Sequence, residues 1–159
     1  MQRVISIGIQ GFDKLRENNY FYVDKTAFIK EWWEAGDDVT LITRPRRFGK
    51  TLNMDMLKCF FSNKYAGRQD LFEGLSIWKE EKYRELQGQY PVIFVSFASI
   101  KADNYKDARD GIISAVFGAY QEYYSLFQEN GIAESEKLFF RELNTYCLLY
   151  TSPSPRDCS

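Results

Sequence analysis

The sequence predicts an α/β fold in which helices cover a mainly parallel sheet. Residues 39–43 (VTLIT) and 91–97 (PVIFVSF) are short, apolar and rich in β-branched side chains, which is typical of buried strands. Stretches with apolar residues at helical spacing lie before, between and after them. Because strands that alternate with helices usually form one layer of parallel strands, we expect an α/β architecture.

The helices are predicted from apolar spacing and from the residues that can begin or end them. In residues 26–35, Thr26 can cap the helix and Gly36 can end it. A second helix starts at Lys50, and its apolar residues lie on one side through Phe61. Further helices are expected over residues 78–86, 105–128 and 135–146, and residues 1–24 are expected to be irregular or to form short β segments.

Composition excludes several classes of protein. The chain has 159 residues, of which 45% are hydrophobic and 17% aromatic, so it is long and apolar enough to bury a core. Lys and Arg number 21 against 22 Asp and Glu, so the net charge of −1 lacks the excess of a basic nucleic-acid-binding domain. No apolar run can span a bilayer, and we expect no membrane association.

Histidine is absent, which excludes Ser-His-Asp triads and His-ligated zinc. The three cysteines, at 59, 147 and 158, have no metal-ligand spacing. A reducing cytoplasm is therefore the expected location. Cys59, beside Phe60 and Phe61, is expected to be a buried, inert thiol.

Residues 147–159 differ from the rest of the chain. The run 147–157 (CLLYTSPSPRD) resembles, without a gap, one reading frame of the transposon-end adapter used to prepare sequencing libraries. We therefore expect residues 1–146 to be the N-terminal part of a domain cut at about Tyr146, and residues 147–159 to be a disordered, adapter-derived tail. The alternative is a genuine disordered tail rich in Ser and Pro.

One segment carries a recognisable chemistry. Residues 44–51 (RPRRFGKT) follow the predicted strand 39–43 and precede a predicted helix. A phosphate-binding loop reads G-x-x-x-x-G-K-[S/T] between a strand and a helix. Here the second Gly, the Lys and the Thr are present, whereas Arg44 replaces the first Gly. Because Gly-Lys-Thr also occurs by chance, an ordinary turn before a helix is the alternative interpretation.

The residue types of this segment suit a triphosphate. The start of a helix exposes unpaired N–H groups and the positive end of the helix dipole, which attract anions. Gly49 lets the backbone approach the phosphates, Lys50 can contact the β and γ oxygens, and Thr51 can offer its hydroxyl to Mg²⁺. Arg46 and Arg47 add donors for phosphate or for a partner's carboxylate. The candidate nucleotide-binding residues are Arg46, Arg47, Phe48, Gly49, Lys50, Thr51 and Leu52, with Thr51 as candidate metal ligand.

Several motifs together resemble the predicted AAA-ATPase-like family of bacteria and archaea. In chain order they are residues 7–12 (IGIQGF), 22–26 (YVDKT), 43–52 (TRPRRFGKTL), 71–75 (LFEGL) and 90–97 (YPVIFVSF). The likeness covers most of residues 3–105 in the order and spacing of the family. The usual loop of that family is R-P-R-R-F-G-K-[S/T], so Arg44 in place of Gly is its ordinary form.

The resemblance implies a three-layer P-loop NTPase fold, truncated here at its C-terminus. It also implies ATP and Mg²⁺ at Gly49, Lys50 and Thr51, and ATP hydrolysis coupled to a conformational change in the parent protein. Members commonly carry a later acidic motif such as Asp-Glu-Tyr-Asp, and often a nuclease-like domain after it. Neither occurs before residue 147, so we expect this chain to bind ATP without hydrolysing it. The sequence indicates no oligomeric state.

Other polar residues have both a functional and a structural interpretation. Asp24 and Lys25 could act near the nucleotide, although the favoured interpretation is that Asp24 helps to start the following helix. Tyr22 could stack on adenine or pack in the core. Asp103 and Asp107 follow the second predicted strand, where catalytic groups of α/β sheets gather, and they suit a loop and a helix start equally well.

The rival function is that of a non-enzymatic module. In that case Arg44, Arg46 and Arg47 would hold nucleic acid or an acidic partner instead of ATP. This hypothesis ranks second because three arginines in one loop, without an excess of positive charge elsewhere, are a weak electrostatic signal.

Overall fold

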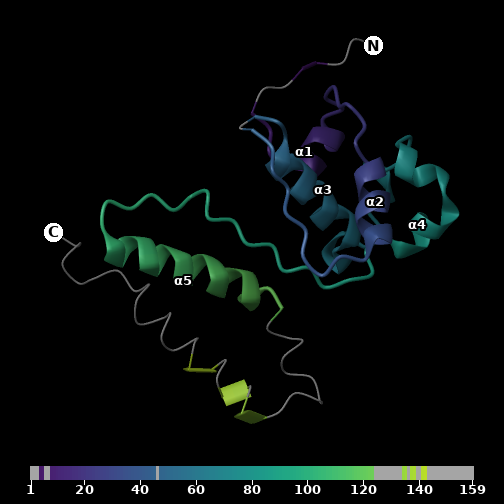
Figure 1. The fold of residues 1–159 in the computed structure, drawn as a ribbon. Helices are drawn as coiled ribbons and strands as arrows, with labels where there is room; N and C mark the ends of the chain where they lie inside the picture. Colours follow the sequence, from purple (N-terminus) through teal and green to yellow (C-terminus); the bar gives the residue numbers. More distant parts are fainter. Residues whose placement is uncertain are drawn as a thin grey trace. The chain divides into compact units, whose positions relative to one another are not determined.

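The protein is described here from a computed structural model, which covers residues 4–5, 8–45, 47–123, 134–135, 137–138 and 141–142. The chain divides into two compact units, Met1–Val92 and Ile93–Ser159. The first unit contains α1 (Phe12–Glu17), α2 (Ala27–Ala35), α3 (Lys50–Phe61), the short 3-10 helices η1 (Asn63–Tyr65), η2 (Gln69–Leu71) and η3 (Ser76–Lys79), and α4 (Glu81–Leu86) (Figure 1). The second unit contains α5 (Tyr105–Gln121).

Helices α2 and α3 lie where the sequence predicts them. Helix α2 ends at Gly36, whose φ of 64° is the left-handed conformation that glycine adopts most readily at a helix end. Helix α3 begins at Lys50 and ends at Phe61. Both predictions are confirmed because they rest on local signals: periodic apolar residues and a glycine at a helix boundary.

The core of the first unit is largely aromatic. Phe72 is fully buried, and its ring lies 5.2 Å from Phe12 and 5.1 Å from Phe60, measured between ring centroids. These three rings come from α1, α3 and the segment after η2, so they hold together elements that are distant in the sequence. The other buried members of the cluster are Ile29, Met56, Cys59, Phe61, Leu71, Leu75, Ile77 and Tyr83.

The structure does not contain the predicted sheet in its described residues. The described residues contain no strand, and their one isolated β-bridge joins Ser62 to Tyr90 in parallel. Residues 39–43 and 91–97 form neither a helix nor a strand, and Val39 and Leu41 are 86% and 82% exposed. The prediction of a three-layer α/β fold with a mainly parallel sheet is therefore wrong. An apolar, β-branched run favours extended backbone, but a sheet also needs a neighbouring strand to accept and donate hydrogen bonds.

Two further elements differ from the sequence-based expectation. Helix α1 lies within residues 1–24, where irregular or β structure was expected. The single exposed helix expected over 78–86 is instead a 3-10 turn followed by α4. Tyr83 of α4 is fully buried, and its hydroxyl donates a hydrogen bond of 2.6 Å to Glu34 Oε1. Tyr83 is thus the buried residue through which the otherwise charged helix α4 contacts α2.

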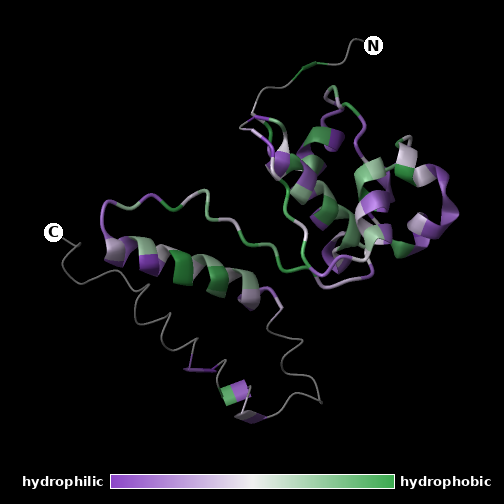
Figure 2. Ribbon diagram, viewed as in Figure 1, coloured by the Kyte–Doolittle hydropathy of each residue, from purple (hydrophilic) through white to green (hydrophobic). Residues whose placement is uncertain are grey.

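The second unit contains, in its described part, an irregular segment, α5 and the helical residues 134–135, 137–138 and 141–142. Figure 2 shows hydrophobic residues along the irregular segment and α5. Gly111 lets the two approach, because a Cβ at this position would lie 3.0 Å from the side chain of Ile100. Helix α5 begins at Tyr105 as predicted. Residues 124–133, most of the helix predicted over 135–146, and the boundary at residue 146 with the tail 147–159 lie outside the described residues.

Candidate nucleotide-binding loop

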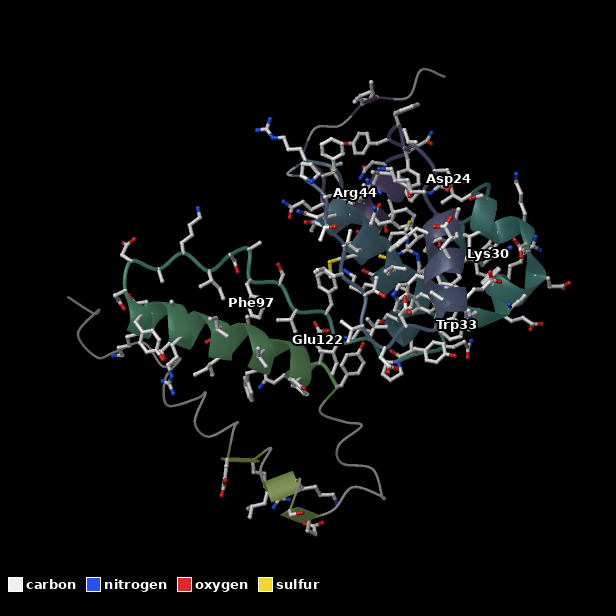
Figure 3. The ribbon with its side chains drawn as sticks, viewed as in Figure 1. Asp24, Lys30, Trp33, Arg44, Phe97 and Glu122 are labelled. Carbon is white, nitrogen blue, oxygen red and sulfur yellow. The ribbon has the colours of Figure 1, made fainter. Side chains whose placement is uncertain are left out.

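Residues 44–49 form a loop that closes on itself. Lys50 Nζ donates a hydrogen bond to the backbone carbonyl of Arg44, six residues earlier. Residue 44 is the position of the first Gly in a phosphate-binding motif, so the lysine joins the first and last parts of the loop. The loop is therefore bent, and the ammonium group of Lys50 is directed back across it. Figure 3 labels Arg44 at the start of this loop.

The backbone of the loop is left-handed at two positions. Gly49, the N-cap of α3, has a φ of 76°, and Arg47 has a φ of 70°. Glycine adopts this conformation readily, whereas for a residue with a Cβ it costs roughly 1–2 kcal/mol. Gly49 has no side chain that could cap α3. The first N–H groups of a helix have no acceptor within the helix, and such groups are the usual ligands of an anion at a helix start.

The strain at Arg47 leads to a stability prediction. Arg47→Gly should raise the free energy of unfolding by about 0.5–1 kcal/mol, because relief of about 1–2 kcal/mol of strain exceeds the added chain entropy of glycine, about 0.5–1 kcal/mol. Urea unfolding followed by tryptophan fluorescence measures the change. Arg47→Ala is the matched control, since it removes the same guanidinium and keeps the Cβ. A glycine variant no more stable than the alanine variant would contradict the prediction.

The segment before α2 reaches the same loop. A Cβ built on Gly49 would lie 4.0 Å from Lys25 Nζ, so this ammonium group is beside the start of α3. Its neighbour Asp24 has a different role. Asp24 Oδ1 accepts hydrogen bonds from the backbone N–H (2.9 Å) and the hydroxyl (2.7 Å) of Thr26, and Oδ2 accepts one from the N–H of Ser76 (2.7 Å). Asp24 therefore serves the start of α2, as the favoured interpretation has it.

The electrostatics of Asp24 agree with this structural role. Burial on its own would raise the pKa of this carboxyl, but the hydrogen bonds from Thr26 and Ser76 outweigh burial and lower the pKa below its usual value. The buried Thr26 does not cap α2 with its side chain. Its hydroxyl lies 2.9 Å from Ser76 Oγ and accepts a hydrogen bond from the N–H of Ile77. The segment 24–26 is thus tied firmly to η3.

Tyr22 belongs to the core. Its ring meets Phe12 edge-on at 5.5 Å, and its hydroxyl donates a hydrogen bond to Met56 Sδ (3.2 Å). Burial raises the pKa of the Tyr22 hydroxyl to about 12. Of the two interpretations of this residue, the structure therefore favours packing over stacking on a base.

Helix α3 is anchored through the buried Asp55, which no sequence motif singles out. Asp55 Oδ2 accepts a hydrogen bond of 2.7 Å from the N–H of Phe12, the first residue of α1, and Oδ1 forms an ion pair with Lys58. Cys59 is fully buried, which confirms the predicted burial, and desolvation raises the pKa of its thiol to about 12, as expected for a thiol of low reactivity. The helix that starts at the loop is thereby joined to the N-terminal helix.

The other candidate residues lie on or beside the start of α3. Arg47, Phe48 and Thr51 are exposed, and Leu52 is partly buried against the core. Arg46 lies outside the described residues. In the described part of the chain, no three His, Cys, Asp or Glu side chains gather into a metal site. An exposed Thr51 hydroxyl fits Mg²⁺, which usually takes one or two protein oxygens and completes its shell with phosphate and water.

Asp103 and Asp107 belong to the second unit. Asn104 caps α5, because its Oδ1 accepts a hydrogen bond of 2.9 Å from the N–H of Asp107 and its Nδ2 donates one of 2.7 Å to Asp107 Oδ2. Asp107 is therefore a helix-start residue. Asp103 is exposed in the preceding loop. No helix of the described ranges combines the length and the apolar character needed to cross a bilayer.

Comparison with known proteins shows similarity to one protein family and to one curated protein. The family model described as "Predicted AAA-ATPase" matches residues 6–152. A protein of Azotobacter chroococcum mcd 1, "Uncharacterized protein in vnfD 5'region", is 40% identical over 97 residues. The match covers 60% of this chain and 17% of that protein, so the chain spans less than a fifth of this relative. No solved structure matches.

Proposed function

Because the chain belongs to the predicted AAA-ATPase family, for which nucleotide binding is expected in general terms, we propose that it binds ATP with Mg²⁺ at loop 44–52. The observation that carries the proposal is the closed loop before α3. The Lys50 ammonium group and the first turn of α3 lie at the two ends of the same bend. An ammonium group and the free N–H groups of a helix start are both groups that bind phosphates.

Each residue of the loop has a distinct proposed role. The N–H groups of residues 48–51 cradle the phosphates, and Gly49 keeps that approach open. Lys50 exchanges the carbonyl of Arg44 for phosphate oxygens, which are the stronger acceptors because they are charged. Thr51 supplies one oxygen to Mg²⁺. When bound, the metal would neutralise part of the triphosphate charge.

The proposal for this chain is binding rather than turnover. No adjacent Asp-Glu pair follows an apolar segment before residue 147. Carboxylates of that kind would position a water molecule for attack on the terminal phosphate, so the roles proposed for residues 44–52 concern binding alone. Hydrolysis coupled to a conformational change is therefore proposed only for longer proteins of the family.

Lys50→Ala tests the proposal. We expect this change to weaken binding of a fluorescent ATP analogue by about ten- to hundredfold, since a hydrogen bond to a charged group contributes about 1.5–3 kcal/mol. The titration is done with the full chain, with Mg²⁺ and with EDTA. The matched control is Lys79→Ala, which removes an exposed lysine of η3 that has no role in the proposal.

Two results would contradict the proposal. The first is equal affinity of the wild type and the Lys50→Ala variant for the analogue. The second is a wild type that does not bind ATP, with or without Mg²⁺, but binds an oligonucleotide or an acidic peptide with an affinity that falls steeply with salt. That result would favour the arginine-based rival function.

A further inference from the structure

A second ammonium group, besides that of Lys50, lies at the start of α3. Lys25 Nζ would lie 4.0 Å from a Cβ built on Gly49, so it stands beside the residue whose backbone opens the helix. Lys25 comes from the segment before α2, and the fold brings it to a loop that lies beyond α2 in the sequence. Among the described residues no carboxylate forms an ion pair with Lys25, whereas Lys30 of α2 is paired with Glu80 at 2.8 Å.

The backbone of Lys25 is held in place on both sides. Its N–H donates a hydrogen bond of 3.3 Å to the hydroxyl of Tyr22, and its carbonyl accepts one of 3.0 Å from the N–H of Phe28. Before Lys25, Tyr22 is packed in the core and Asp24 is hydrogen-bonded to Ser76. After it, the hydroxyl of Thr26 accepts a hydrogen bond from Ile77, so the residues on both sides of Lys25 are also held. The lysine therefore presents its side chain from a rigid segment, which reduces the entropy lost when it binds a ligand.

Charge at the start of α3 indicates what this lysine would bind. The ammonium group of Lys25 lies beside Gly49, that of Lys50 lies on the carbonyl of Arg44, and the N-terminus of α3 adds positive charge. The loop also carries the exposed residues Arg44 and Arg47. The one carboxylate adjacent in sequence, Asp24, directs both oxygens to Thr26 and Ser76. A ligand with several negative charges would satisfy this cluster better than a ligand with few.

We propose that Lys25 is a second phosphate-contacting residue of this site and that it makes the site prefer a nucleoside triphosphate to a diphosphate. The inference rests on the proposed nucleotide binding at loop 44–52. Each further phosphate adds negative charge and oxygen acceptors, so the gain from a second ammonium group is larger for the triphosphate. Lys25 thus acts on ligand choice, whereas Lys50 holds any ligand with a phosphate chain.

The test compares fluorescent ATP and ADP analogues on the full chain. Lys25→Ala should weaken ATP binding by about ten- to hundredfold and ADP binding by a clearly smaller factor, so that the ratio of the two dissociation constants falls. Lys25→Arg should restore part of the preference because it keeps the charge. Lys79→Ala should leave both affinities unchanged, and circular dichroism should show the same helix content in all variants.

The outcomes separate this inference from the proposed function. If the wild type binds neither analogue, the proposed function and this inference both fall. If Lys50→Ala weakens binding but Lys25→Ala leaves the ATP-to-ADP ratio at its wild-type value, the site stands and the role of Lys25 is refuted. If Lys25→Ala weakens both ligands equally, Lys25 is a general anchor and the proposed triphosphate preference is refuted.

Discussion

Phe72→Ala should lower the free energy of unfolding by about 3–5 kcal/mol, the usual cost of removing a fully buried phenylalanine ring. Phe72 is 0% exposed and lies between the rings of Phe12 and Phe60, at 5.2 and 5.1 Å. Truncation leaves a cavity among α1, α3 and the segment after η2, and rings held by separate elements cannot all move in to fill it. Urea unfolding followed by tryptophan fluorescence reports this loss, because Trp32, Trp33 and Trp78 pack against the same core.

Phe97→Ala is the matched control for that experiment. Phe97 undergoes the same chemical change, but it is 53% exposed, so the expected effect is within about 0.5 kcal/mol. If Phe72→Ala cost less than about 1 kcal/mol, the aromatic cluster would not be the element that stabilises the first unit.

What could be predicted from the sequence was local. Helix α3 follows from apolar residues at helical spacing after Gly49, and the end of α2 follows from Gly36. The loop between residue 44 and Lys50 was also recognisable, because its chemistry resides in a short run of adjacent residues. In each case the deciding signal and the resulting structure occupy the same few positions.

The predicted sheet failed because pairing is not local. Residues 39–43 and 91–97 have the composition of strands, yet the described part of the chain offers neither of them a partner strand. Val39 and Leu41 are consequently exposed rather than buried. Composition fixes the preference of a segment for extended backbone, whereas burial and pairing depend on what the rest of the chain brings beside it.

In the candidate site, too, local motifs were recognised from the sequence and tertiary contacts were not. Gly49 and Lys50 were found from their motif. Lys25 was noted in the sequence only as a residue that could act near the nucleotide, and the fold shows its ammonium group beside Gly49. Asp55 sits within an ordinary helical pattern and yet provides the acceptor for a helix 43 residues earlier. Tertiary contacts of single polar side chains carry no periodic signal, so they become visible only in the folded chain.

Asp55→Ala should lower the free energy of unfolding by about 3 kcal/mol. The change leaves the N–H of Phe12 without its acceptor, which costs about 1–3 kcal/mol for a buried donor, and it removes the ion pair between Asp55 and the partly buried Lys58. Because Asp55 belongs to α3 and Phe12 to α1, the loss should be greatest at the contact between these two helices.

Urea unfolding measures the total effect of Asp55→Ala, and hydrogen exchange locates it. The amide of Phe12 should be protected in the wild type and exchange much faster in the variant. Asp55→Asn is the matched control, since its side-chain oxygen still accepts a hydrogen bond from Phe12 while the charge opposite Lys58 is lost. The free energy of unfolding should therefore fall by about half as much as in Asp55→Ala, and the amide of Phe12 should keep most of its protection. Unchanged exchange at Phe12 in Asp55→Ala would show that Asp55 does not hold α1 against the helix that begins at the nucleotide-binding loop.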